Sequence, residues 1–458
     1  MIFHRRVCTA LLASSLCATW TSLASAQAPS TAVSSTFVQP EVSDSMLVPP
    51  ERAPAEVKSW DEALAMIRRS PSFLTSVAEV ERAIAQRRIA LAAVLPTLIA
   101  NASYTHNFNT LAVPFGTAVL IEPPASVWTV SASASWNVLN PRGIYGVGTA
   151  DLGIDVAKLT LDDRRRVLAG SVVASLLATL SAERVAELNR IGLRTALERL
   201  GLTQARFKLG SGIELDIDRA QQDVAASRAQ LISGDEALRQ SREALGQALG
   251  SATALSAPLE LDLEGFEKAV AGTCKLADRV ERRADIAAAS QRVAIAERQI
   301  TDAKLQFAPS LALGSTVGHA SETTLGPNDT WSVAATLTVP LYDGGVRYGA
   351  LRDAKAAAEQ ARDALATARV DAMIEVARAT RAIAVDTAAR DVAREQRELA
   401  ARIDARTREG YAKGLGTSLD LVTSAQALRQ AEINLVLQDF ELAQARAGAV
   451  LVNAECVY

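Results

Sequence analysis

The second half of this sequence repeats the first half at an offset slightly above two hundred residues. Eight residues recur 204 positions further on: Gly210, Gly212, Leu215, Asp216, Gln222, Leu231, Asp235 and Leu238 return as Gly414, Gly416, Leu419, Asp420, Gln426, Leu435, Asp439 and Leu442. Five upstream residues recur at an offset of 203: Trp128, Val130, Ala132, Tyr145 and Gly146 return as Trp331, Val333, Ala335, Tyr348 and Gly349. A repeat of this length contains a whole structural unit, so one fold has to explain both copies.

The N-terminus has the pattern of a secretory signal. Arg5 and Arg6 precede an apolar run over residues 7–23, and the small residues 24–26 follow it. This arrangement predicts a signal peptide over residues 1–26 and therefore an exported protein. Residues 27–55 are rich in Ser, Pro and Ala without periodicity, which predicts a flexible N-terminal extension.

Charge and hydropathy exclude two classes of protein. Loss of the signal leaves 46 basic residues of the original 48 against 51 acidic ones, so the exported chain is mildly acidic. This balance does not suggest a nucleic-acid partner. No stretch after the signal approaches the roughly twenty apolar residues that we expect of a membrane helix. A membrane crossing would therefore have to use strands.

Only two cysteines remain after the signal peptide, Cys274 and Cys456. In an oxidising periplasm they could form a disulfide. Two isolated buried thiols are the alternative, and the sequence does not choose between them.

Four segments alternate apolar and polar side chains with the period of two that is typical of strands. They cover about residues 97–108, 128–139, 310–320 and 331–341. A half-buried soluble sheet would show the same alternation. Here the polar faces carry small, mostly hydroxylated residues and almost no charge, which suits a water-filled lumen. Each segment also has about the ten residues of a tilted transmembrane strand. We therefore predict an outer-membrane β-barrel.

Four strands are too few to close a membrane barrel, which needs about eight or more and cannot leave an edge unpaired in lipid. Several copies of the chain must therefore contribute to one barrel. Two, three or four copies would give about 8, 12 or 16 strands.

The segments between the strands and the glycine loops are helical in composition. Long helices are expected over about residues 144–209 and 346–409, and sixty helical residues span roughly 90 Å. Shorter helices are expected over residues 61–69, 72–94, 276–283 and 285–307. After each glycine loop a heptad of large apolar residues appears: Ile217, Val224, Leu231, Leu238 and Leu245, then Leu421, Leu428, Leu435, Leu442 and Ala449. This spacing is typical of an extended coiled coil, although an ordinary helical bundle would also explain it.

The order of these elements, across nearly the whole exported chain, resembles the TolC family of outer-membrane efflux proteins. The residues that carry the likeness are Trp60, Ala63, Leu64, Ser70, Pro71, Leu95 and Pro96, then Arg283, Asp285, Ile286 and Pro309, then the run from Pro340 to Gly345, and the pairs Phe207 with Gly210 and Tyr411 with Gly414. The resemblance implies a mainly α-helical homotrimer with a 12-stranded barrel in the outer membrane and a long helical barrel across the periplasm.

The same resemblance implies a domain plan and a set of partners. Residues 56–250 would form the first structural repeat, residues 251–275 an extended equatorial linker, and residues 276–458 the second repeat. The partners would be two further copies of the chain, outer-membrane lipid, a periplasmic adaptor and an inner-membrane pump of the proton-driven or ABC type.

The resemblance places the glycine loops at the periplasmic tip, where they would meet the adaptor. The docking candidates are Phe207, Gly210, Ser211, Gly212, Tyr411, Gly414, Leu415 and Gly416. Asp420 and its equivalent Asp216 are the candidates for the periplasmic gate, where three copies of Asp420 would form a cation-attracting ring.

The residues themselves also support a simpler role. An acid in the first turn of a helix is favourable beside the helix dipole, and Thr417 with Asp420 fits a capping box. Only the second copy carries this box, so we look for the gate there. The chain departs from the family's best-known gate, because Gly416 stands where a basic residue is expected and Thr423 where a second acid is expected.

No constellation in the sequence indicates catalysis, a cofactor or a metal. The glycine motifs follow helices rather than strands, so they are turns and not phosphate loops. His106 and His319 occupy equivalent strand ends, which are often polar in membrane strands. We therefore predict a passive exit duct for drug or metabolite efflux or for type I protein secretion, in the outer membrane of a Gram-negative bacterium. The alternative is an exported trimeric coiled-coil structural protein or adhesin with a membrane anchor.

Overall fold

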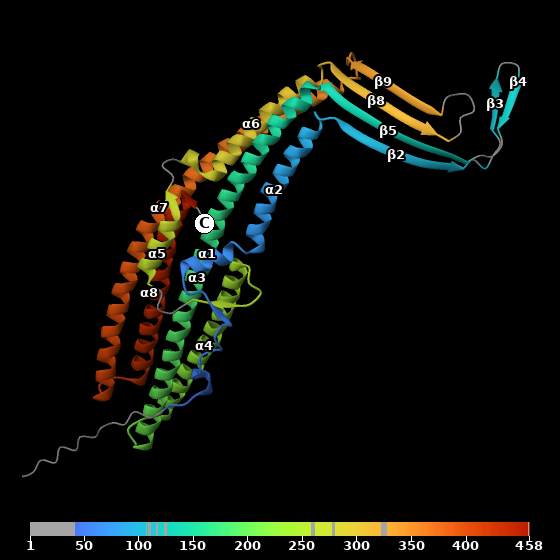
Figure 1. Ribbon diagram of the computed structural model, residues 1–458. Coiled ribbons are helices and arrows are strands. Elements are labelled where there is room, and N and C mark those ends of the chain that lie inside the picture. The colour runs from blue at the N-terminus through green and yellow to red at the C-terminus, as the bar shows by residue number, and fades with distance from the viewer. Residues whose placement is uncertain are drawn as a thin grey trace, which may run out of the picture. The chain divides into compact units, whose positions relative to one another are not determined.

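The computed structural model describes residues 42–106, 108, 111–115, 118–122, 126–257, 262–276, 280–321, 328–456 and 458. The expected signal peptide over residues 1–26 and the first part of the expected extension lie outside these residues. The helices are α1 Trp60–Ile67, α2 Pro71–Ala92, α3 Pro141–Lys208, α4 Glu214–Leu249, α5 Leu263–Thr273, α6 Ala284–Leu305, α7 Val346–Ala412 and α8 Ser418–Val452, with short 3-10 turns at Ser45–Leu47 and Val280–Arg282 (Figure 1). The strands are β1 Ala55–Glu56, β2 Thr97–His106, β3 Leu111–Phe115, β4 Ala118–Glu122, β5 Ser126–Leu139, β6 Leu255–Ser256, β7 Cys274–Leu276, β8 Ser310–Ala320, β9 Asp329–Thr338 and β10 Ala454–Cys456.

Local sequence sets the helix ends. Helix α2 begins after Ser70, whose hydroxyl accepts a hydrogen bond from the backbone N–H of Phe73, and Pro71 occupies the first helical position. Helix α3 begins in the same way, with Asn140 as the cap and Pro141 next. Proline is favoured there because its missing N–H would have no partner in the first turn. Helix α4 ends at Gly250, whose φ of 73° lies in the left-handed region that glycine adopts readily.

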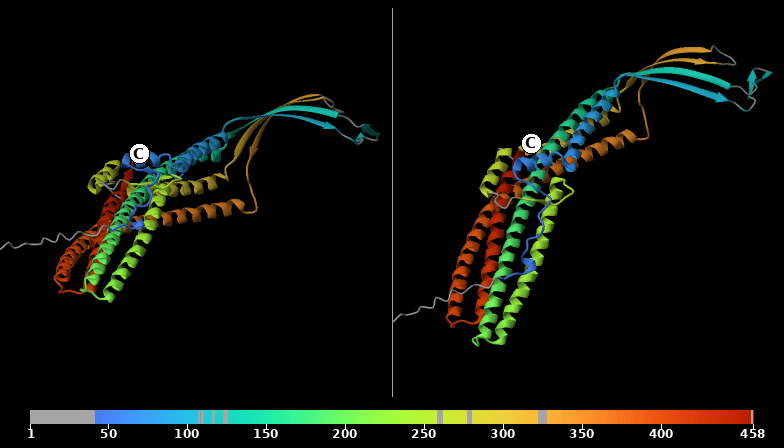
Figure 2. Two further views of the ribbon diagram at one scale, coloured as in Figure 1. Left: turned by 90° about the horizontal axis from the view of Figure 1, so that it is seen from below. Right: turned by 60° about the horizontal axis from the view of Figure 1, so that its bottom comes forward.

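The helices form one layer in which the long helices α3 and α7 alternate with shorter ones. Nearest the strands, α2 packs on α3, α3 on α6, and α6 on α7. Further away, α4 packs on α3, α3 on α8, and α8 on α7, so α4 continues the position of α2 and α8 that of α6. Figure 2 shows α3 beside α4 and α7 beside α8 in both views. The layer consequently has two free edges, one formed by α2 and α4 and the other by α7.

The large sheet has the strand order β2-β5-β8-β9 with antiparallel pairing throughout. Its registers place apolar residues opposite one another, for example Ala102 opposite Val130 and Val317 opposite Trp331. Side chains of both faces are exposed along β2 and β9, so the rest of the described chain covers neither face of these edge strands. Leu98 and Trp331 are each 77% exposed. A soluble sheet would bury such an apolar face, which argues against the half-buried alternative.

The main hydrophobic core lies in a belt where α2 meets α4 and α6 meets α8. Its residues come from α1, α2, α3, α4, α5, α8 and the short strands, and Ile67, Val172 and Val270 are fully buried in it. Two small sheets hold the ends of the repeats at this belt. Strand β1 pairs with β6 in parallel, and β10 pairs with β7 in antiparallel.

The structure differs from the sequence-based expectations at several places in the belt. Residues 42–55, expected to be flexible, include a 3-10 turn whose flanking Asp44 pairs with Arg228 of α4 at 2.7 Å. The linker over residues 251–275, expected to be extended, contains α5, because Phe266 and Val270 recur at helical spacing and are buried. In the segment 276–283, expected to be a helix, the structure shows only the end of β7 and a 3-10 turn in the residues that it describes.

Two further expectations need correction. Along the chain, the connection from β2 to β5 contains a small separate hairpin of β3 and β4, which was not predicted from the sequence. An 18-residue window of α3 is apolar enough by composition to span a membrane, contrary to the expectation. More than half of that window, 56%, is buried inside the chain. The apolar residues of α3 that are buried in the belt core explain its hydropathy.

Candidate functional site

The two glycine loops have the same backbone structure. In the first loop, the N–H of Gly210 donates to the carbonyl of Phe207, and that of Ser211 donates to the carbonyl of Arg206. The same pair of bonds recurs 204 residues later, from Gly414 and Leu415. This is the Schellman arrangement, which requires the left-handed conformation at its glycine. Gly210 and Gly414 have φ values of 73° and 76°.

The second glycine of each loop is favoured by close packing. A Cβ atom on Gly212 would lie 3.2 Å from the backbone nitrogen of Phe207, and one on Gly416 would lie 3.3 Å from that of Tyr411. The loops therefore turn tightly against the helix that they leave. Close packing thus favours Gly416, at the position where the family resemblance led us to expect a basic residue.

The loops expose apolar side chains at the tips of the hairpins. Leu209 is 81% exposed and Leu415 is 84% exposed, while Phe207 is partly exposed. Tyr411, the equivalent of Phe207, is buried. The guanidinium of Arg206 lies 4.5 Å from the centre of the Tyr411 ring and donates to its backbone carbonyl at 3.2 Å. The docking candidates of the sequence therefore lie together at one end of the helical layer, except that Tyr411 is covered by α3.

Asp420 has the capping role that the sequence indicates. Its N–H donates to the hydroxyl of Thr417 at 3.2 Å, and its carboxylate accepts from the backbone N–H of Thr417 at 3.1 Å. The hydroxyl of Thr417 also donates to this carboxylate at 2.6 Å. These bonds, from the hydroxyl first and the N–H second, hold the pKa of Asp420 below its usual value. The side chain is exposed, so the charged carboxylate can interact with cations or with another chain.

Asp216 has a different environment from its equivalent. Its carboxylate accepts a hydrogen bond from the hydroxyl of Ser418, which is buried on α8, and lies 3.6 Å from Arg219. Helix α4 has Ile213 at its cap position and no side-chain cap. The first acid of the pair thus connects the two repeats, whereas the second caps its own helix.

Above the loops, a buried polar cluster joins α3, α4 and α8. Asp223 is 1% exposed, accepts from Arg199 at 2.5 Å and accepts from Gln426 at 3.0 Å. Arg429 donates to Ser227 at 2.9 Å. Burial lowers the pKa of Arg429, although the nearby carboxylate of Asp223 opposes this effect. Sequence reasoning missed this cluster, because the positions equivalent to Arg199 and Asp223 in the second copy are Ile403 and Ala427.

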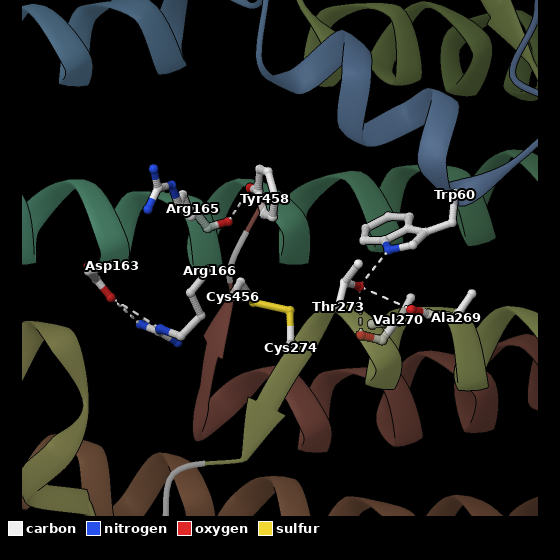
Figure 3. The surroundings of a disulfide bond; sticks show 10 residues. All are labelled: Trp60, Asp163, Arg165, Arg166, Ala269, Val270, Thr273, Cys274, Cys456 and Tyr458. Atoms are coloured by element: carbon white, nitrogen blue, oxygen red, sulfur yellow. Dashed lines mark hydrogen bonds and ion pairs between the residues drawn. A yellow bond between two sulfur atoms is a disulfide. The ribbon is translucent and has the colours of Figure 1, made fainter.

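Cys274 and Cys456 form a disulfide between β7 and β10, at the belt (Figure 3). Beside it, the indole N–H of Trp60 donates to Thr273 at 2.8 Å. The hydroxyl of Tyr458 donates to the carbonyl of Arg165 at 2.6 Å. The bond joins a residue at the end of the expected linker, two positions before the expected second repeat, to a residue near the end of that repeat, and 182 positions separate the two cysteines.

The two strand-end histidines have partners within their own hairpins. His106 lies 2.8 Å from Ser126, and His319 lies 2.7 Å from Asp329. Within the residues that the structure describes, no group of three or more His, Cys, Asp or Glu side chains could hold a metal ion.

In this chain an uncovered four-stranded sheet continues into helices of about 100 Å. Such a sheet is typical of one class, the proteins of the bacterial outer membrane. Comparison with known proteins identifies the family. The sequence profile described as outer membrane efflux protein matches residues 64–251 and 277–449. This chain belongs to that family, and it is an outer-membrane protein of a Gram-negative bacterium.

Individual relatives agree with this assignment. The pyoverdine export outer membrane protein OpmQ of Pseudomonas putida is 25% identical over 346 residues, which are 73% of this chain and 71% of OpmQ. The outer membrane channel CmeC of Campylobacter jejuni superposes with a TM-score of 0.73 at 16% identity, over 90% of this chain and 92% of CmeC. VceC of Vibrio cholerae superposes with a TM-score of 0.69 at 18% identity, over 86% and 96%. Their names, an export protein of the outer membrane for OpmQ and an outer membrane channel for CmeC, agree with the family resemblance of the sequence.

Proposed function

We propose that the chain is the passive exit duct of a tripartite export system and works as a homotrimer. The observation that carries the proposal is the large sheet. Its apolar face suits lipid and its small polar face suits water, and the described chain covers neither face of the edge strands. Because the sheet continues directly into α3 and α7, a closed barrel of strands would open into a tube of helices.

Both edges of the chain support ring closure by further copies. Strands β2 and β9 are the edges of the sheet, and an unpaired edge is not tolerated in lipid. The helical layer also has an unpaired edge on each of these sides. Helices α2 and α4 form the edge on the side of β2, and α7 forms the edge on the side of β9. Helix α7 carries an uncovered apolar stripe at its free side, with Val385, Val392, Leu399 and Ile403 each more than 40% exposed. Three copies would give the 12 strands of the TolC family.

Two measurements test this proposal against the trimeric adhesin. The mass of the detergent-solubilised protein should be three times that of the chain, and the purified trimer should form steady single channels in a planar lipid bilayer. A trimer that never conducts would support the anchored coiled coil instead. A monomer would contradict both.

The tips support docking onto a periplasmic adaptor, with an inner-membrane pump supplying the energy. Leu209 and Leu415 present apolar surface that the chain itself does not cover. Exchange of both leucines for Ser should weaken co-purification with the adaptor and leave the bilayer conductance unchanged. The same double exchange at the exposed Leu98 and Leu337 of the barrel strands is the contrasting control, because it should spare adaptor binding.

For the gate we propose Asp420 rather than Asp216. The carboxylate of Asp420 is exposed and charged, whereas that of Asp216 is bound by Ser418. Three copies of Asp420 would attract cations at the periplasmic entrance. Asp420→Asn should therefore relieve block of the channel by divalent cations, and an unchanged block would refute the role.

A further inference from the structure

The contact between the two repeats of one chain is a template for the contact between neighbouring chains. In a ring of alternating repeats, every repeat meets the next one in the same way. A residue of the first repeat that touches the second should have its equivalent, 204 positions later, touching the first repeat of the next copy. Since the repeat offset is known, the contacts within the chain can be translated into contacts between chains.

Four polar contacts connect the repeats near the tips, and we call them the repeat contacts. They are Arg206 with Tyr411, Asp216 with Ser418, Asp223 with Gln426, and Ser227 with Arg429. Each joins residues that are 202 to 205 positions apart, so equivalent levels of the two hairpins meet.

Translation by the repeat offset gives the matching contacts between copies, with the second residue on the neighbouring chain. They are Gly410 with Phe207, Asp420 with Glu214, Ala427 with Gln222, and Ala431 with Ala225. Six of these eight positions carry a different residue from the template, whereas Asp420 and Gln222 keep the template residue. None of the four pairs can form the template's hydrogen bonds between side chains. One pair, Asp420 with Glu214, brings two acids together.

The exposure of these residues in the single chain agrees with the translation. Ser418, Asp223 and Arg429 are buried at the repeat contacts. Their equivalents Glu214, Ala427 and Ala225 are exposed. Residues that are buried where the two repeats meet thus have equivalents that are exposed at the two free edges of the chain.

Side-chain volume also matches across the predicted contact. Arg429 lies over Gly192 of α3, where a Cβ atom would be 2.6 Å from the Arg429 Cδ atom. The equivalent positions carry the small Ala225 and the larger Gln396, and both are exposed. A small residue opposite a large one occurs in both cases with the sides exchanged, so the free edges can pack as closely as the repeats do.

We propose that Glu214 of one copy meets Asp420 of the next at the periplasmic tip, and that the contacts between chains open there before the repeat contacts do. The inference rests on the proposed trimeric duct and adds a second acid to its entrance. Hydrogen bonds stabilise the contact within each chain, whereas like charges weaken the contact between chains. The bonds of Asp420 with Thr417 fix its carboxylate in place beside the neighbouring chain.

Paired cysteines test the placement in the full-length protein, with the Cys274–Cys456 disulfide retained. We expect Glu214→Cys with Asp420→Cys to give covalent trimers on a non-reducing denaturing gel after mild oxidation. The matched control, Asp216→Cys with Ser418→Cys, should become resistant to alkylation without forming multimers, because its two sulfurs belong to one chain. Covalent multimers from the control pair, or none from the first pair, would overturn the inference.

A charge reversal tests the consequence for opening. Glu214→Lys should attract Asp420 of the neighbour and lower the open probability of the channel by roughly two- to five-fold, the range that corresponds to an exposed ion pair. Glu214→Gln should give an intermediate value. An unchanged or increased open probability in Glu214→Lys would refute the proposed opening.

Failure of this inference is distinguishable from failure of the proposed function. If the protein is trimeric and conducts but the first cysteine pair gives no multimers, the duct remains and only the tip contact is wrong. If the protein is neither trimeric nor conducting, the proposed function itself fails.

Discussion

At the scale of single residues, two left-handed glycines that look alike have different tasks. Gly250 ends α4, and a Cβ atom there would lie 2.8 Å from Ser70 Cβ and 2.9 Å from Pro71 Cδ. It therefore allows the end of α4 to touch the start of α2 inside the belt. Gly414 has a similar φ, but no atom lies within 4 Å of its added Cβ. Its loop needs the conformation alone.

Gly250→Ala should destabilise the protein more than Gly414→Ala. Both variants should lose about 1–2 kcal/mol of stability, because alanine is strained in the left-handed conformation. Only Gly250→Ala adds overpacking, typically about 1–3 kcal/mol. The thermal unfolding midpoints of the two variants in detergent, each compared with wild type, measure the difference. Equal shifts would show that α2 and α4 do not press together at this point.

Asp285 gives the belt a predictable acid sensitivity. Burial alone would raise its pKa, but the hydrogen bonds and charge of Arg283 outweigh burial and lower it. The two side chains are joined at 2.9 Å and 3.1 Å, and Arg283 is itself 3% exposed. A lowered pKa means that the carboxylate stabilises the folded state at neutral pH. This stabilisation is lost as the pH falls from the unfolded pKa of about 4 through the lower folded value.

Asp285→Asn should therefore lower the free energy of unfolding at neutral pH by about 1.5–3 kcal/mol, as for loss of a hydrogen bond to a charged group. The deficit should shrink as the pH falls from about 4 toward the lowered pKa of folded Asp285, where the wild-type carboxyl becomes protonated too. Unfolding midpoints measured from pH 3 to pH 7 check this. Asp391→Asn, on a side chain that is 60% exposed, is the control and should shift little at any pH. A deficit independent of pH would mean that the charge of Asp285 does not matter.

At the scale of elements, the short strands of the belt close each repeat. Strand β1 pairs with β6 for the first repeat, and β10 pairs with β7 for the second. Only the second pair is covalently fixed, by Cys274 with Cys456. The disulfide thus closes a loop that contains α6, α7, α8 and the strands β8 and β9 of the large sheet. A cross-link over so long a loop restricts the unfolded chain strongly.

Cys274→Ala with Cys456→Ala should cost about 2–4 kcal/mol of stability, the usual contribution of a native disulfide. The thermal midpoint of the variant should fall to that of reduced wild type, and reductant should not lower it further. Alkylation under non-reducing conditions should label neither cysteine of the wild type. Labelling of both would show that the thiols are free, and equal midpoints in all samples would show that the bond contributes nothing.

At the scale of the whole molecule, the proposed assembly depends on the free edges of the chain and not on its core. The layer of helices and the large sheet end on the same sides, so one kind of contact with a neighbour satisfies both. The apolar stripe of α7 would be covered by α2 and α4 of that neighbour. An ionised side chain placed there would lose water without gaining a partner.

Val392→Glu should shift the protein from trimer to monomer while the α7–α8 hairpin stays folded, because burial of an unpaired charge costs several kcal/mol. Arg394→Glu, an exposed change two positions away, should leave the trimer intact and serves as the control. Native mass spectrometry in detergent gives the oligomeric state, and circular dichroism gives the helix content. A trimeric Val392→Glu would place the interface elsewhere on α7.

Much of the fold can be predicted from the sequence because its signals are local. The heptad residues Val224, Leu231 and Leu442 are buried as expected, since helical spacing alone assigns them to one face. The capping box of Thr417 with Asp420 depends on residues three positions apart and is present as predicted. The belt is harder to predict from the sequence, because the short helix α5 and the strands β1 and β6 are stabilised by contacts with segments that are distant in sequence.

The sequence by itself determined the duplication, the family, the four strands of the large sheet and the long helices. The strands and helices could be predicted because periods of two and of 3.6 report which face each element buries. Only the tertiary structure decided which residues meet across the two repeats. Asp216 and Asp420 are equivalent in sequence, yet the first is bound by Ser418 and the second caps its own helix. The physical reason is register: residues 202 to 205 positions apart meet only after both hairpins have folded and packed side by side.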